Sequence, residues 1–154
     1  HAAVEEERDH RRRDRRPVAA QQSQHEDQEH QAVGQAAGAE VMAAWLAQSK
    51  IVPNVVWAHN DDMALGAIEA IEAAGLIPGK DMKIISVDGV RDAFKAMIAG
   101  KLACSVECSP LLGPQLMKAV RDYMDGRNLP LRIITEEGVF SAANAASEIS
   151  RRRY

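Results

Sequence analysis

The chain has 154 residues, enough for one domain with a hydrophobic core, and a formal net charge of −3 at pH 7. This charge gives no general basic field, so we expect no nucleic-acid partner. No apolar run approaches the roughly 20 residues that a membrane-spanning helix needs. The first residues are charged and lack an apolar segment, so we expect no signal peptide in this chain.

The first 35 residues differ in composition from everything that follows. Residues 1–35 contain no Leu, Ile, Met or aromatic residue, and they hold four of the five histidines. Such a segment buries too little apolar surface to offset its chain entropy, which predicts a disordered charged tail. Its arginine run, 11–16, resembles a nucleic-acid or nuclear-import patch, but neighbouring acidic residues neutralise much of it.

From residue 36 onward, apolar runs of strand length alternate with segments of helical periodicity. We expect helices over 36–49, 61–74, 90–99, 110–125 and 141–154, and strands over 55–58, 83–87, 102–108 and 131–135. The strand at 55–58 is apolar enough to be buried. This alternation predicts an α/β fold with a parallel sheet and flanking helices.

Polar residues follow two neighbouring strands of this predicted sheet. Asn60 lies in the sequence His59-Asn60-Asp61-Asp62, and Asp88 lies in an Asp-Gly turn. Ligands of parallel sheets bind outside the carboxyl ends of the strands, so both side chains are candidates for one crevice. Asn and Asp together suit the hydroxyl groups of a sugar or polyol. A plain helix N-cap for Asn60 and a turn residue for Asp88 remain the alternatives.

Other residue types that carry chemistry give weaker signals. An enzyme using His59 as a base is the least favoured hypothesis, because the sequence shows no nucleophile elbow, phosphate-binding loop or metal spacing. Cys104 and Cys108 would lie about 13 Å apart on one strand, at roughly 3.3 Å per residue, which is too far for a disulfide. We expect buried free thiols, and neither a metal nor a cofactor.

Three motifs carry a resemblance to a known family. They are VVWAHNDDMALGAIEAIEAAGLIPGKDMKIISVDGV, then FKAMIAGKLACSVECSP, then the closing basic residues with Tyr154. From about Val55 the chain resembles the C-terminal half of periplasmic sugar-binding proteins of the ribose and galactose type, the solute-binding components of ABC importers. Within that family it is most similar to the galactofuranose-binding receptors. The resemblance implies a type I periplasmic-binding-protein fold, a monosaccharide ligand, an ABC permease partner and a periplasmic location.

The resemblance also assigns site residues and lobes. It implies that Asn60 and Asp88 bind sugar hydroxyls, and that Cys108 occupies a position where many members have a polar residue, often Gln. Residues 36–107 would form the second lobe, and 108–154 a crossover with remnants of the first lobe. Half a cleft should bind sugar weakly or not at all. The helix expected at 110–125 would leave Leu112, Leu116 and Val120 uncovered, so we expect self-association.

Two further hypotheses concern the protein class and the N-terminal segment. The effector domain of a lactose-repressor-type regulator shares this fold, but residues 1–35 have no apolar stripe from which to build a helix-turn-helix. Family members have ordered β-α structure where this chain is charged. An out-of-frame reading of the gene, with sense resuming near Gly38, would explain the change in composition.

Overall fold

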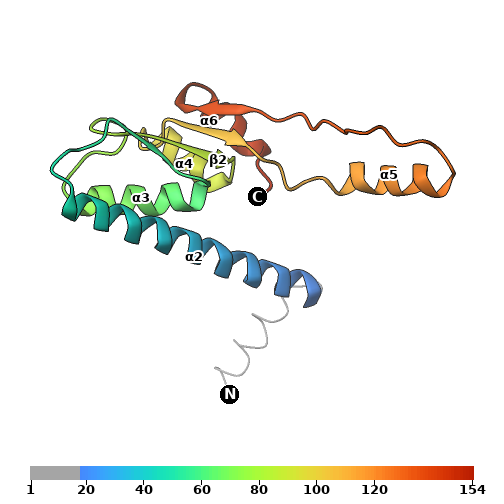
Figure 1. Cartoon of the computed structure of the whole chain (residues 1–154), viewed down its shortest axis with the longest axis horizontal. Coiled ribbons are helices and arrows are strands. Elements are labelled where there is room, and N and C mark those ends of the chain that lie inside the picture. Colours follow the sequence, from blue (N-terminus) through green and yellow to red (C-terminus); the bar gives the residue numbers. More distant parts are fainter. Residues whose placement is uncertain (1–17) are drawn as a thin grey trace, which may run out of the picture. The chain divides into compact units, whose positions relative to one another are not determined.

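The computed structural model describes residues 18–154, of which 34–154 form one compact unit. Its helices are α2 (Val18–Gln48), α3 (Asp61–Ala73), α4 (Arg91–Ile98), α5 (Gly113–Met124) and α6 (Ala142–Glu148), followed by the 3-10 helix η1 (Ile149–Arg151) (Figure 1). Its strands are β1 (Val55–Trp57), β2 (Lys83–Asp88), β3 (Cys104–Glu107) and β4 (Val139–Ser141). The predicted α/β class is confirmed.

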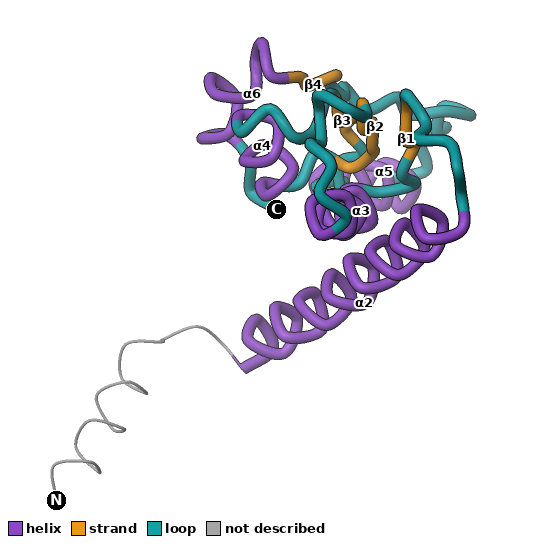
Figure 2. The backbone as a smooth tube through the Cα atoms, turned by 90° about the vertical axis from the view of Figure 1, so that its left-hand side faces the viewer, coloured by secondary structure: helices purple, strands orange, loops and turns teal. Residues whose placement is uncertain are grey.

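The four strands form one sheet in the order β1-β2-β3-β4, as Figure 2 shows. β1, β2 and β3 are parallel, and β4 pairs with β3 in the antiparallel direction. The prediction of a strand at 131–135 was wrong. The side chains of Leu131 and Ile134 are exposed there, whereas Phe140 in β4 is buried with its ring centroid 4.8 Å from that of Phe94. Packing on the core therefore selects β4 as the partner of β3.

The sheet and helices α3 and α4 enclose the core, whose fully buried members include Ile71, Ile84, Phe94, Met97 and Leu102. The burial predicted for the first strand was wrong, because β1 lies at the edge of the sheet with its Val55 and Trp57 side chains exposed.

The helix predicted at 36–49 is longer in the structure, where α2 begins at Val18. Disorder over 18–35 was therefore the wrong expectation, because a segment rich in Ala, Gln and Glu has good intrinsic helix propensity without an apolar face. The rest of the predicted tail lies outside the described residues. Near its C-terminal end α2 packs closely on α3, where Gly38 and Gly66 allow the two backbones to touch.

The helix predicted from Pro110 starts three residues later, at Gly113. The Ser109 hydroxyl accepts a 3.3 Å hydrogen bond from the Leu111 amide, so it closes a local turn instead of capping the helix. No residue of α5 is buried. The helix predicted at the C-terminal end corresponds to α6 and η1, and Ser141 forms a capping box with Asn144.

Candidate functional site

The residues predicted for a binding site lie together at the carboxyl edge of the parallel strands. The Ala58 amide, which follows β1, donates a 2.9 Å hydrogen bond to the Ile85 carbonyl of β2. The Cys108 amide, which follows β3, donates a 3.0 Å hydrogen bond to the Asp88 carbonyl at the end of β2. Asn60 begins α3 directly after β1. We call the edge formed by Asn60, Asp88 and Cys108 the polar edge.

Asn60 is the N-cap of α3, as its position before Asp61 and Asp62 indicated. Its backbone is extended, and its Oδ1 accepts a 2.8 Å hydrogen bond from the Met63 amide. This bond uses the acceptor of the side-chain amide and orients the group, while Nδ2 retains two donor positions. The capping and binding interpretations of Asn60 are therefore compatible.

Asp88 has an unusual backbone for a residue with a side chain. Its φ of 125° is positive, and the following Gly89 has a φ of 82°. A conformation of this kind costs on the order of 1–3 kcal/mol and persists only where the surroundings impose it, frequently at functional sites. Burial raises the pKa of Asp88 above the usual 3.8, the nearby Asp61 carboxylate raises it further, and a backbone hydrogen bond from Asp61 acts in the opposite direction.

Asp61, in the first turn of α3, has a role at this edge that the sequence did not indicate. Its side chain is fully buried. One oxygen accepts hydrogen bonds from the hydroxyls of Ser86 and Ser105, the latter at 2.7 Å. The other accepts from the amides of Gly89 and Val90 at 2.7 and 2.8 Å. One carboxylate thus ties the start of α3 to β2, to β3 and to the turn before α4.

The carboxylates around this turn influence one another. Asp62 is half-buried beside Asp61, and its pKa is raised by burial and then by the charges of Asp61, Asp88 and Asp92. Among the residues from 31 to 154, no group of three or more His, Cys, Asp and Glu is arranged to hold a metal ion. The polar edge therefore offers hydrogen-bond acceptors and donors, a chemistry that suits hydroxyl groups.

Glu107, at the end of β3, takes part in a cluster with the last residues of the chain. Its carboxylate accepts hydrogen bonds from Arg152 at 2.5 Å, Tyr154 at 2.8 Å and the Gly138 amide at 2.9 Å. Burial on its own would raise the pKa of Glu107, but these hydrogen bonds outweigh it and the pKa lies below 4.5. Glu107 is thus occupied by structural partners.

The remaining candidates take different places. Cys108 is exposed at the polar edge, contrary to the expected burial, whereas Cys104 is half-buried and its thiol pKa is raised by burial and by Asp61. Both are free thiols, as expected. His59 is exposed at the corner before Asn60. Within the described part of the chain, no helix is long and apolar enough to cross a membrane.

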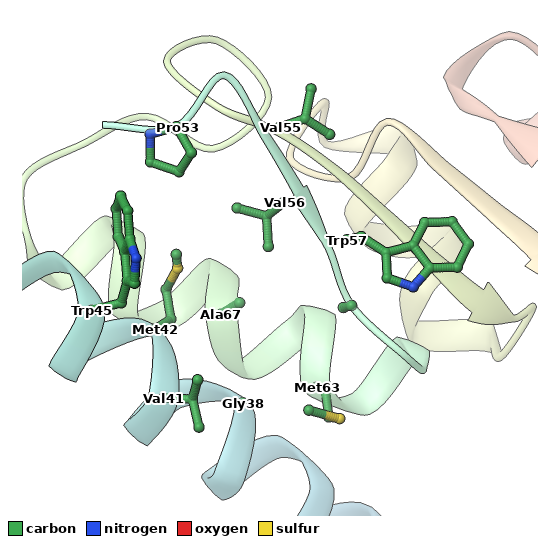
Figure 3. A pocket seen from close by; sticks show the side chains of 11 residues that line it. Gly38, Val41, Met42, Trp45, Pro53, Val55, Val56, Trp57, Met63 and Ala67 are labelled. Carbon is green, nitrogen blue, oxygen red and sulfur yellow. The ribbon is translucent and has the colours of Figure 1, made fainter. Parts of the chain in front are cut away.

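A separate apolar groove of about 340 Å³ lies between α2, β1 and α3. Figure 3 shows Val56 of β1 pointing toward Met42 of α2 and Ala67 of α3, while Trp57 points to the other side of the strand. Neither Asn60 nor Asp88 lines this groove. Its lining is almost entirely apolar, so it lacks the convergent polar groups that fix a hydroxylated ligand.

Comparisons with known proteins give a consistent family. The sequence model of one protein family, the periplasmic binding protein domain, matches residues 17–128. The galactofuranose-binding protein of Escherichia coli is 36% identical over 119 residues, covering 75% of this chain and 37% of that protein. The fructose import binding protein of Bifidobacterium longum is 42% identical over 93 residues, covering 60% of this chain and 28% of that protein.

A solved structure agrees with these sequences. The periplasmic binding protein of the arabinose ABC transporter from Shewanella sp. ANA-3, bound to L-arabinofuranose, superposes with a TM-score of 0.70 at 47% identity, covering 77% of this chain and 40% of that chain. This chain belongs to the periplasmic binding protein domain family, with the type I fold that the motifs indicated. It spans less than half the length of these relatives.

Proposed function

We propose that this chain is the C-terminal, sugar-binding part of the solute-binding protein of a periplasmic ABC sugar importer. The observation that carries the proposal is the polar edge, where Asn60 and a strained Asp88 end two neighbouring parallel strands. The relatives described above include a fructose import binding protein and the binding protein of an arabinose ABC transporter, which favours this function over the effector domain of a repressor. The ABC permease would be the partner of the whole protein.

The ligand in this proposal is a monosaccharide in the furanose form, such as galactofuranose. Asn60 would donate from Nδ2, and Asp88 would accept from sugar hydroxyls with its carboxylate. Cys108 borders the same edge, and its exposed thiol would contact the sugar at the position that the resemblance assigns to a polar residue. We propose binding without turnover, so sugar recovered after incubation with the protein should be chemically unchanged.

The proposal is tested by titrating the ¹⁵N-labelled chain with methyl β-D-galactofuranoside and with L-arabinose, followed by NMR. A partial cleft buries less ligand surface, so we expect weak affinity, about millimolar, with shifts at Asn60, Gly89 and Cys108. Asn60→Asp keeps the capping oxygen and removes the donor, so it should weaken binding while leaving α3 intact. Asn128→Ala, in an exposed loop, is the matched control.

Two results would contradict the proposal. One is the absence of shifts at the polar edge of a folded chain at sugar concentrations of about 50 mM, well above the affinity expected for a partial cleft. The other is equal affinity in wild type and in Asn60→Asp, which would leave Asn60 with a capping role alone.

Self-association of this chain is part of the proposal. The exposed apolar side chains of α5 include Leu116, Met117, Tyr123 and Met124, and Leu112 and Val120 are uncovered as the sequence predicted. Contiguous apolar surface of this kind favours association of copies in solution.

A further inference from the structure

Asp61 is not adjacent to ligand in the proposed function, yet it makes more hydrogen bonds than any candidate ligand residue described above. Its two oxygens accept from two serine hydroxyls and two backbone amides that come from β2, β3 and the turn before α4. The Gly89 amide also donates to Ser105 at 3.1 Å, which closes the network.

The network holds the segment that contains Asp88. The amides of Gly89 and Val90, which follow Asp88 directly, both point at Asp61. Asp88 itself keeps a φ of 125°, a conformation that a residue with a side chain leaves unless its neighbours hold it. Val90 is also the N-cap of α4 and has no side-chain cap, so Asp61 accepts from the amides at that helix start.

We propose that Asp61 is the positioning residue of the polar edge: its buried carboxylate fixes the Asp88–Gly89–Val90 turn and so places the Asp88 side chain beside Asn60 for the sugar. This inference rests on the proposed function. Asp61 touches no sugar in it and acts through Asp88. The strand register supports the geometry, since Asp88 lies opposite Glu107 at the last paired position of β2 and β3.

The test compares Asp61→Ala with Asp61→Asn in the whole chain. Alanine leaves the amides of Gly89 and Val90 without their acceptor, so the turn should relax and sugar affinity should fall about tenfold or more. Asparagine retains an acceptor for these amides and turns its NH₂ toward the serine oxygens, which are able to accept. Asp61→Asn should therefore keep affinity within about threefold of wild type.

A sugar-free readout separates this inference from the proposed function. In Asp61→Ala, hydrogen exchange of the Gly89 and Val90 amides should become faster, and Asp61→Asn should restore the protection. Asp92→Ala, an exposed residue paired with Lys95 at 2.6 Å, is the control and should change neither readout. Thermal unfolding checks that each variant is folded. If Asp61→Ala unfolds, Ser105→Ala replaces it, because it removes one hydroxyl donor to Asp61 and the second acceptor of the Gly89 amide, and it should likewise speed exchange of that amide.

The Asp88 carboxyl titration reports how close the Asp61 charge lies to Asp88, and it needs no sugar. Other charged groups around the turn are Asp62, Glu107 and Arg152, and all three remain in the variant. Since the charge of Asp61 raises the pKa of Asp88, Asp61→Asn should lower that pKa while binding near pH 7 persists.

Three results would overturn the inference. They are unchanged amide exchange in folded Asp61→Ala, unchanged sugar affinity in that variant, or an equal loss of affinity in Asp61→Asn and Asp61→Ala. A wild-type chain that binds no sugar refutes the proposed function, and amide exchange still decides whether Asp61 holds the turn.

Discussion

The close crossing of α2 and α3 gives a prediction that the structure quantifies. A Cβ added to Gly66 would lie 1.9 Å from the carbonyl oxygen of Gln35 and 2.8 Å from the Ala39 amide nitrogen, both on the backbone of α2. The helices would have to separate by at least about 1 Å, because contacts under 3.0 Å to backbone atoms are not tolerated.

Gly66→Ala should therefore destabilise the chain, although alanine is the better helix former by about 1 kcal/mol. Overpacking of a close contact costs about 1–3 kcal/mol, and backbone atoms yield less readily than side chains. We expect a net loss of about 2 kcal/mol in the free energy of unfolding, or about 1 M in the urea midpoint.

The assay is urea unfolding followed by circular dichroism, with Gly113→Ala as the matched control. Gly113 begins α5, its φ is not in the positive range, and an added Cβ there meets nothing within 4 Å. This control should be neutral or stabilising by up to about 1 kcal/mol. A Gly66→Ala variant as stable as wild type would show that α2 does not pack on α3 in this way.

Three further predictions concern other contacts. Glu107→Gln should lower the free energy of unfolding by about 3 kcal/mol in thermal unfolding at pH 7. Arg152 would keep its charge without its partner, in a site where the Glu107 and Arg152 side chains are only 12% and 11% exposed. Since the pKa of Glu107 is lowered in the folded chain, the stability that its carboxylate contributes should be lost as the pH falls below about 4.5. Sugar affinity should fall on acidification at a higher pH than an ordinary aspartate with a pKa of 3.8 would give, because the raised pKa of Asp88 protonates the acceptor earlier. Leu116→Glu should raise the monomer fraction in analytical ultracentrifugation, and an unchanged fraction would exclude α5 as the associating surface.

Local signals in the sequence predicted the first helix of the polar edge well. Asn60 before two aspartates indicated an N-cap, and the structure has α3 starting at Asp61 with Asn60 as its N-cap. Strand ends and polar corners also predicted that Asn60 and Asp88 would share one edge. The cap depends on neighbours within a few residues, and the shared edge follows from the parallel order of the strands, so the sequence indicates both.

The features that were missed depend on distant partners. Asp61 binds Ser86 and Ser105, which lie 25 and 44 residues away, and no local pattern marks a buried carboxylate as their acceptor. The last strand was predicted at 131–135 because those residues have strand propensity. The strand that pairs with β3 is β4, and the burial of Phe140 against Phe94 decides this pairing. Tertiary packing overrode local strand propensity at 131–135.

The most direct test of sugar binding at the polar edge is a set of intermolecular nuclear Overhauser effects between methyl β-D-galactofuranoside and the ¹⁵N-labelled chain. We predict contacts from sugar protons to the side-chain amide of Asn60 and to the backbone amide of Gly89. Contacts confined to Trp45 and Val56, which line the apolar groove, would contradict this prediction and would move the ligand away from Asp88.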